Sequence, residues 1–543
     1  MTRPMTGRLA ALRSLLWPRP TERLVPAVSA VILALSFPPL HLLVPPFIGL
    51  VPFALWVHGL PADGEGRRAA VRGSMVFGAI YFGIIFYWIL VALIWFTPLA
   101  ILAFLAALVG LIAIAALFGW TLHRAVHGVR APLWIALPVA WTAAEWVRAN
   151  LPSTLAFPWL GLGTSLTGFP ELVGVAELVG ARGVTFWMAT VNGLVAVLVL
   201  RLRANQGWVR QAVVVTLAVA GPMSWGVWRS NTLEMRDAGR VTVMQPNIPE
   251  HIKLDARTGL DSTFASLITL LPEVPTNADL VVMPEVTFRI FPEADIHAGW
   301  LEPLKAWSAY ARSPILFGAL GFEGDLGGRF TPYNSAFLVD PFELRDYRYD
   351  KRFLVPFVER VPLLPPDWFG TLQYFGGFGV GEGWPLALVG DEAYGVLICY
   401  ESSYPEASRR FRLEGADVLV NITNDAWYGR EPLYARTTAL WQHPAHMVMR
   451  AIENRMGVAR AANTGISLFV DPVGRVHDAT ELFELDVHTA TVRTTDIVTF
   501  YTRYGDLLGS GSAMAALLLV LASVWLARGA GARTTLDPSE PGI

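Results

Sequence analysis

Long apolar runs occupy the first 230 residues and the end of the chain, and a block of mixed composition separates them. The runs cover residues 24–37, 42–60, 73–96, 98–120, 132–147, 183–200, 211–228 and 512–527. Most approach the roughly 20 residues that an α-helix needs to cross about 30 Å of hydrocarbon. The pattern predicts a polytopic α-helical membrane domain with about eight spans.

The basic residues between these runs predict the orientation of the spans. Loops on the cytoplasmic side of a membrane carry an excess of Lys and Arg. With the N-terminus inside, each even-numbered span should lead into a basic loop, and each does. These loops contain Arg67, Arg68 and Arg72, then His123, Arg124 and Arg130, then Arg201, Arg203 and Arg210. Seven spans therefore place the next residues outside the cytoplasm, and the last run returns the chain to Arg528 and Arg533.

The block from about 240 to 500 alternates short apolar runs with polar helical stretches, which is typical of an α/β domain. We expect strands at residues 240–245, 280–283, 314–319, 334–339, 394–398, 417–421, 459–462 and 467–470. Helices are expected at residues 259–271, 300–312, 404–414 and 435–455. The predicted organisation is a membrane domain of seven helices (1–230), a folded extracytoplasmic domain (231–505), and a C-terminal span with a cytoplasmic tail (506–543).

The composition agrees with a chain that lies partly in lipid. Hydrophobic residues make up 53% of the chain and charged residues only 16%, whereas soluble domains carry about 25% charged residues. The net charge of −2 gives no sign of a polyanionic partner, so we expect no nucleic acid.

The first candidate for chemistry is Cys399, the only cysteine in the chain, so a disulfide within one copy is excluded. It follows the apolar run Val396 to Ile398 and precedes Pro405, which predicts a turn from a strand into a helix. A helix N-terminus lowers the pKa of a thiol, and the thiolate is the form that attacks carbonyl groups. The alternative is a buried cysteine that acts only as a small apolar side chain.

Two further residues suit the same chemistry. Glu285 closes the strand expected at 280–283, and Lys351 lies between a polar turn and an apolar run. Each alone is better explained by a solvated surface position, or for Lys351 by an amine that snorkels to the surface. Together with Cys399 they suggest a mechanism in which Glu285 takes the thiol proton, Cys399 attacks a carbonyl, and Lys351 stabilises the oxyanion.

The order of these residues resembles a known superfamily. The segments MPE, YDKRFLVPFVERVP and GVLICYE are similar to those of the nitrilase superfamily, which has an α/β/β/α sandwich and a Glu-Lys-Cys triad. The flanking spans narrow the resemblance to the apolipoprotein N-acyltransferases. MQPNIP (244–249), NITNDAWYG (421–429), RAANTGIS (460–467) and EWVRANLPSTLAFPWLGLG (145–163) support it over nearly the whole chain. The chain departs from the family pattern at Leu254, where the family usually has Trp, and at Met283, where it often has Trp.

The resemblance implies a fold, a reaction and a location. The fold would be a polytopic membrane domain plus a nitrilase-like sandwich, in the bacterial cytoplasmic (inner) membrane with the sandwich on the periplasmic side. Cys399 would take an acyl chain from a phospholipid as a thioester and give it to the α-amino group of a lipoprotein's N-terminal diacylglyceryl-cysteine. Glu359, Tyr400 and Glu401 would support the site, and neither a cofactor nor a metal is implied.

Several residues could contact the lipid substrates. Trp427, Tyr428 and the aromatic segments 368–384 and 427–434 are candidates for mobile lids at the membrane interface, or else for ordinary core. Glu145 and Arg148 are costly in lipid and either pair with each other or contact a headgroup. His443 and His446 have metal-ligand spacing but lack a third ligand motif, so we assign them to structure or surface.

Two other functions are consistent with parts of this pattern. A membrane-anchored nitrilase-type amidase or hydrolase would use water as acceptor, and its spans would be a simple anchor. The other is a non-enzymatic binding or transport protein whose α/β domain has lost its catalytic activity. The segment 145–163 is more than an anchor requires, and the presence of Glu285, Lys351 and Cys399 together argues against a dead domain.

Overall fold

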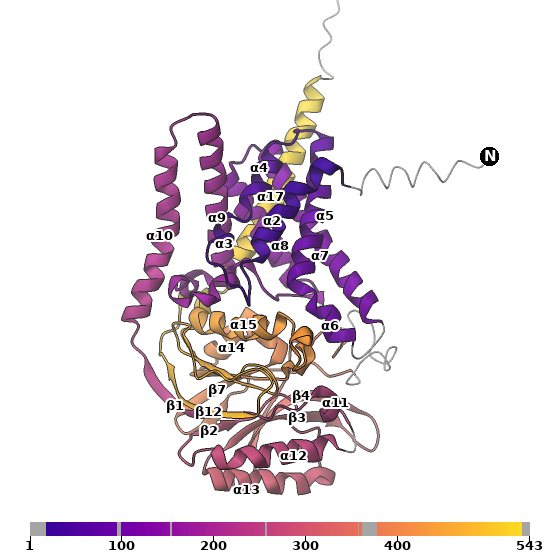
Figure 1. The fold of residues 1–543 in the computed structure, drawn as a ribbon, viewed down its shortest axis with the longest axis vertical. Helices are drawn as coiled ribbons and strands as arrows, with labels where there is room; N and C mark the ends of the chain where they lie inside the picture. The colour runs from indigo at the N-terminus through magenta and orange to yellow at the C-terminus, as the bar shows by residue number, and fades with distance from the viewer. Residues whose placement is uncertain are drawn as a thin grey trace, which may run out of the picture.

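The computed structural model describes residues 18–94, 99–152, 155–255, 258–356, 358–360 and 377–534. Helices from the first half of the chain gather at one end of the molecule, and a β-rich part lies at the other end (Figure 1). The C-terminal helix α17 (Leu507–Thr534) returns from the β-rich part to the helical part, where it packs on α8 (Leu133–Ala149) through Ala516, Val139 and Ala143.

Every predicted span contains a helix. Besides α8 and α17 these are α2 (Leu24–Ala34), α3 (Pro45–Ile48), α4 (Val51–His58), α5 (Gly64–Phe86), α6 (Trp88–Ile94), α7 (Ala100–His123), α9 (Ala176–Arg203) and α10 (Val209–Thr232). Within the described residues, five helices are long and apolar enough to cross a membrane, namely α5, α7, α9, α10 and α17. The remaining predicted spans correspond to the shorter α2, α3 with α4, and α8. The count of eight therefore stays a prediction.

The basic segment with Arg67, Arg68 and Arg72 is not a loop, as the sequence suggested, but forms the first turns of α5. The helix begins early because the Asp63 side chain accepts a hydrogen bond from the Gly66 backbone N–H at 2.8 Å, which caps it. Arg72 is consequently buried, and its guanidinium forms ion pairs with Glu22 at 2.6 Å and Glu65 at 2.9 Å. The predicted third span is also divided, because α5 ends at Phe86 and α6 begins at Trp88.

The β-rich part contains two six-stranded sheets. The first has the order β12-β1-β2-β3-β4-β5 and the second the order β11-β10-β9-β8-β7-β6. The strands are β1 (Arg236–Gln245), β2 (Leu280–Val282), β3 (Ile315–Gly324), β4 (Phe330–Val339), β5 (Leu344–Asp350), β6 (Ala387–Val389), β7 (Glu392–Ile398), β8 (Val418–Thr423), β9 (Gly457–Ala462), β10 (Leu468–Val470), β11 (Val476–His477) and β12 (Asp486–Thr494). Strands β1, β2 and β3 pair in parallel, as do β7, β8 and β9.

The sheets stack face to face with helices on both outer faces, which is the expected α/β/β/α sandwich. Alternation along β2 shows why: Leu280 and Val282 belong to the core between the sheets, whereas Val281 packs toward the helices. α12 (Gly259–Leu270) and α13 (Leu301–Ala311) cover the first sheet. α14 (Pro405–Leu413) and α15 (Ala439–Asn454) cover the second and lie between it and the membrane helices (Figure 1). All four helices were predicted.

Polar contacts through α15 fix the sandwich against the helical part. Gln442 accepts a hydrogen bond from Trp159 Nε1 at 3.0 Å and donates one to the Ile85 carbonyl at 3.1 Å. Arg455, directly after the helix, forms an ion pair with Glu177 of α9 at 2.8 Å. Since these groups are buried and satisfied, the reactive residues next to α15 have a defined position relative to the membrane.

Candidate active site

Cys399 lies at the turn where β7 ends and a short 3-10 helix (Cys399–Ser403) begins, as predicted. Its φ of 53° is in the left-handed region, which is unusual for a residue with a side chain. Its carbonyl oxygen accepts a hydrogen bond from His443 Nε2 on α15 at 3.0 Å. The turn therefore presents the sulfur beyond the strand, and the helix behind it stabilises this conformation.

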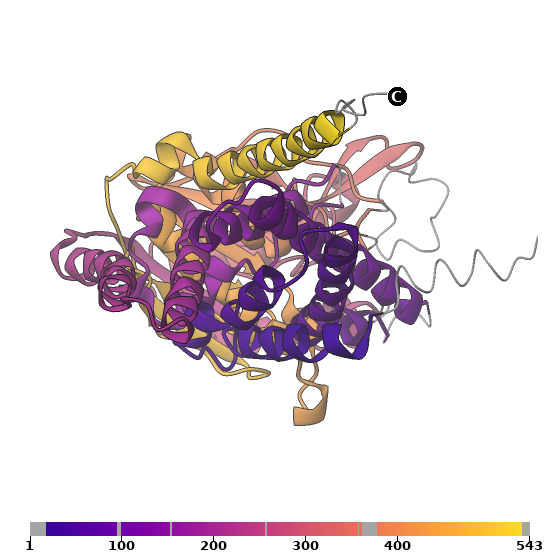
Figure 2. The same ribbon diagram turned by 90° about the horizontal axis from the view of Figure 1, so that it is seen from above.

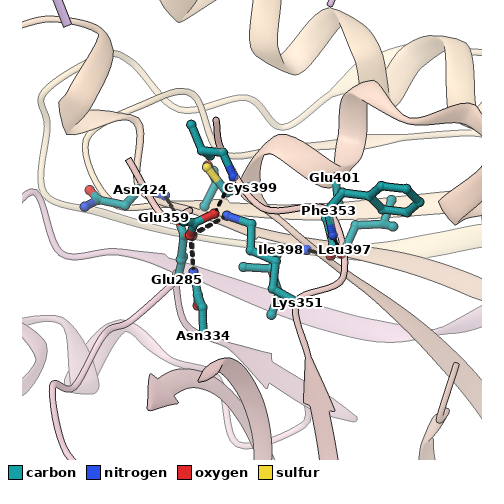
Figure 3. A network of polar contacts seen from close by, with 12 residues as sticks. Glu285, Asn334, Lys351, Phe353, Glu359, Leu397, Ile398, Cys399, Glu401 and Asn424 are labelled. Atoms are coloured by element: carbon teal, nitrogen blue, oxygen red, sulfur yellow. Dashed lines mark hydrogen bonds and ion pairs between the residues drawn. The ribbon is translucent and has the colours of Figure 1, made fainter. Parts of the chain in front are cut away.

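The acid and the amine predicted from the sequence meet beside this sulfur (Figure 3). Glu285 follows β2 and Lys351 follows β5, so three strand ends supply the three side chains. The Glu285 carboxylate is close enough to the Cys399 thiol for each group to act on the pKa of the other. Lys351 Nζ lies 3.3 Å from Glu285 Oε1, and all three side chains are buried.

Glu359 and Asn334 complete the charge balance around Lys351. Glu359 Oε1 accepts from Lys351 Nζ at 2.9 Å. The Asn334 side-chain amide donates to Glu285 at 2.8 Å and to Glu359 at 3.0 Å. One ammonium thus lies between two carboxylates that share an amide donor, which satisfies groups that would be costly to bury alone.

The charges set the resting protonation states. Burial raises the pKa of Glu285, but the Lys351 ammonium and the Asn334 hydrogen bond outweigh it, so that pKa is lowered overall. Burial opposes the Lys351 charge, yet Glu359 and Glu285 hold the pKa of Lys351 above its ordinary value. The resting site therefore contains a carboxylate ready to accept a proton and an ammonium ready to stabilise negative charge.

The expected low pKa of Cys399 is wrong. Burial raises the pKa of the thiol, and the Glu285 carboxylate raises it further against the opposing effect of Lys351. The residues after the thiol form a single 3-10 turn rather than an α-helix, so little dipole acts on the sulfur. Cys399 is consequently a neutral thiol at rest, so the predicted role as nucleophile requires that its proton leaves as it attacks.

A cavity of about 340 Å³ connects this centre to the membrane helices. At one end its wall includes Cys399, Glu285 and Lys351. At the other end it is formed by apolar residues of α6 and α7, among them Ala103, Ala107 and Leu111. An acyl chain that lies against α6 and α7 can therefore bring its carboxyl end to the sulfur.

Comparison with known proteins identifies the chain. The family model described as the apolipoprotein N-acyltransferase N-terminal domain matches residues 29–194, and the carbon-nitrogen hydrolase model matches residues 240–500. The apolipoprotein N-acyltransferase of Geobacter metallireducens is 30% identical over 92% of this chain and 95% of its own. That of Ralstonia nicotianae is 32% identical over 82% of this chain and 83% of its own. The chain belongs to the apolipoprotein N-acyltransferase family.

A solved structure also matches about half of the chain. A CN-hydrolase superfamily protein of Xanthomonas campestris is 18% identical over 48% of this chain and 92% of its own, with a TM-score of 0.34.

Glu401, which the resemblance to the N-acyltransferase family placed in support of the site, joins the loop of Lys351 to the turn of Cys399. Its carboxylate accepts from the backbone N–H groups of Ile398 and Arg352, both at 2.8 Å, and from the Tyr349 hydroxyl at 2.8 Å. Burial raises the pKa of Glu401, and these donors act against that rise. Glu401 thus fixes the spacing between amine and sulfur without touching either.

Replacing Glu401 with glutamine tests this spacing. The amide nitrogen would face backbone donors, and an unsatisfied buried donor costs about 1–3 kcal/mol. We expect the free energy of unfolding to fall by that amount and kcat to fall by roughly 10–100-fold, since small displacements of reacting groups have such effects. Denaturant titration and initial rates in detergent measure both, with E406Q on the surface of α14 as control. Wild-type kcat in E401Q would contradict this role.

The residues expected to contact substrate divide into two groups. Arg148, Trp427 and Tyr428 line the cavity, as does Tyr400, which was expected to support the site. Glu145 does not: its carboxylate accepts from Trp141, the Leu162 backbone and Thr185. Arg148 donates to the carbonyls of Trp159 and Leu160 instead of pairing with Glu145. Glu145 therefore organises the segment after α8, and its predicted contact with substrate has no geometric support.

Of the two aromatic segments, 427–434 is described in full and 368–384 only in part. Residues 368–376 lie outside the described residues, while Phe378 lines the cavity and Trp384 packs on Phe411 with ring centroids 5.1 Å apart. In the other segment, Leu433 is 80% and Tyr434 90% exposed. They belong to a loop that projects from the molecule at the lower edge of Figure 2.

Sequence reasoning missed a buried polar network behind the sulfur. His443 Nδ1 lies 2.8 Å from Asp425, and Arg460 donates to the same carboxylate at 2.6 Å. Burial raises the pKa of Asp425, but Arg460 and His443 outweigh it and lower that pKa. His443, assigned from the sequence to structure or surface, is buried in this network, and its contact with the Cys399 carbonyl was not foreseen. The sequence signal that could have indicated this network is the adjacent Asn424 and Asp425 in NITNDAWYG.

Proposed function

We propose that this protein transfers a fatty acyl chain from a membrane phospholipid to the α-amino group of the N-terminal diacylglyceryl-cysteine of apolipoproteins. The carrying observation is the cavity that joins Cys399 to the apolar surface of α6 and α7. A phospholipid chain resists leaving the bilayer because each buried CH₂ contributes about 0.8 kcal/mol. Because the site is open to the membrane helices, the phospholipid chain need not leave the bilayer to reach Cys399.

The residues act in two half-reactions. In the first, Glu285 accepts the Cys399 proton while the sulfur attacks the ester carbonyl, and Lys351 stabilises the oxyanion. The carbon–oxygen bond then breaks, and Glu285 returns the proton to the departing lysophospholipid oxygen. In the second, the acceptor amine attacks the thioester, a carbon–nitrogen bond forms, and the carbon–sulfur bond breaks to restore the thiol.

The proposed location follows the predicted topology. The chain would lie in the bacterial inner membrane, with residues 1–230 and 506–543 in or beside the bilayer. The domain at 231–505 would hold Glu285, Lys351 and Cys399 on the periplasmic side, where mature lipoproteins present their N-termini. The basic residues after the even-numbered spans support this orientation.

Intact-mass measurement tests the acyl-enzyme. Purified protein given phospholipid without acceptor should gain one acyl mass that neutral hydroxylamine removes. Acceptor peptides with and without a diacylglyceryl group then separate transfer from hydrolysis: only the lipidated peptide should discharge the thioester and gain the acyl mass. An unmodified thiol, or release of free fatty acid at the same rate without acceptor, would contradict the proposal.

A further inference from the structure

A second buried carboxylate, that of Glu250, faces the cavity beside the reactive centre. Glu250 opens the short helix α11 (Glu250–Lys253), and its side chain is only 4% exposed. It lines the same cavity as Cys399 and Glu285. Neither half-reaction described above uses it.

Asn424 connects this carboxylate to the reactive one. Its side-chain amide donates to Glu250 Oε2 at 2.6 Å, and its backbone N–H donates to Glu285 Oε2 at 3.0 Å. Asn463 donates to Asn424 Oδ1 at 2.9 Å, which fixes the orientation of that amide. One residue thus holds both carboxylates in place at the cavity wall.

The other oxygen of Glu250, Oε1, is open to a ligand. The part of the chain that the structure describes provides no hydrogen-bond donor to it, and the nearby Lys253 ammonium donates to the Glu285 carbonyl at 2.9 Å. Because Glu250 lines the cavity, a donor group that enters the cavity can reach this oxygen. The cavity therefore offers a built acceptor for a positively charged N–H group.

We propose that Glu250 binds the α-ammonium group of the acceptor and removes one of its protons, so that the neutral amine attacks the Cys399 thioester. This inference rests on the proposed function. The ammonium proton passes to Glu250 and the carbon–nitrogen bond forms. The second amine proton passes through Glu285 to the sulfur as the carbon–sulfur bond breaks. Glu250 then releases its proton to water.

The charges around Glu250 suit this role. Burial raises the pKa of Glu250, and Glu285 raises it further, while Lys253 and Arg289 act in the opposite direction. Arg289 is occupied with the Leu254 carbonyl at 3.3 Å. Because an α-amino group has a pKa of about 7.7–8.0, a raised carboxyl pKa lessens the free-energy cost of the proton transfer.

Single-turnover measurements on E250Q separate this role from the proposed function. Glutamine keeps an oxygen for Asn424 but cannot accept a proton. We expect thioester formation from phospholipid at the wild-type rate, and transfer to a diacylglyceryl peptide roughly 10²-fold slower near neutral pH. Neutral hydroxylamine needs no deprotonation, so it should discharge the thioester of both proteins equally. E302Q, on the exposed surface of α13, is the matched control.

The pH dependence gives the decisive readout. Below the amine pKa the neutral fraction falls tenfold per pH unit, so transfer by E250Q should follow that fraction, while the wild type uses the ammonium form and falls less. The two rates should converge at about pH 9, above the amine pKa. Equal transfer rates near neutral pH, or equal slowing of both half-reactions, would overturn the inference. Absence of a thioester on the wild type would instead refute the proposed function.

Discussion

Replacing Cys399 with alanine is expected to reduce acyl transfer to the uncatalysed background. No other cysteine exists in the chain to take its place, and loss of a catalytic nucleophile costs roughly 10⁴-fold or more in rate. The acyl mass should be absent from the variant at any phospholipid concentration. Initial rates with a lipidated peptide, together with intact mass, measure both consequences.

The same variant should remain folded. The sulfur lies on a cavity wall rather than in close-packed core, so its removal leaves only a small additional void. The thermal midpoint in detergent should stay within a few degrees of the wild type. Residual activity in a folded C399A above the background rate would show that another group carries the acyl chain.

Replacing Lys351 with methionine should impair both stability and catalysis. Methionine fills similar volume but leaves the Glu285 and Glu359 carboxylates buried without their cation, which costs about 3–5 kcal/mol. Loss of the oxyanion partner should lower kcat by roughly 10²–10³-fold. Denaturant titration and single-turnover acylation measure these effects. K305M, at a partly exposed ion pair on α13, is the matched control.

The stability difference between wild type and K351M should depend on pH in one direction. The pKa of Glu285 is lowered in the folded wild type. Its contribution is therefore present above the unfolded value of about 4.3 and is lost as the pH falls below it. The two proteins should differ most near neutrality and converge in acid. A constant difference across this range would show that the ammonium does not stabilise the carboxylate.

The sequence predicted the centre of each sheet better than its edges. Central strands such as β2 and β8 are buried on both faces and appear as continuous apolar runs, so all of the central strands were found. The four strands that were missed, β5, β6, β11 and β12, are the outer strands of the two sheets. In β5 and β12 apolar residues alternate with polar ones, as in LRDYRYD of β5, because an edge is partly solvated. β6 and β11 are only three and two residues long, too short for a pattern to show.

In the candidate site, too, residues that local sequence marks were predicted, whereas residues whose role depends on distant contacts were not. Glu285 and Cys399 were predictable because each ends an apolar strand, and Lys351 because it lies between a polar turn and an apolar run. The family resemblance added Glu359, Tyr400 and Glu401. Glu250 and His443 were not predicted as parts of the site, because their significance depends on Asn424 and on the Cys399 carbonyl, which are distant in the chain. The raised thiol pKa likewise depends on burial, which local sequence does not reveal.

The reactive residues come from both layers of the sandwich, since Glu285 and Lys351 follow strands of the first sheet and Cys399 follows a strand of the second. Neither sheet alone therefore supplies all three of these side chains. On the proposed function, a nascent chain in which only one sheet has formed would therefore be unable to deacylate phospholipid. Reactivity toward lipid would begin only when the two sheets have packed against each other.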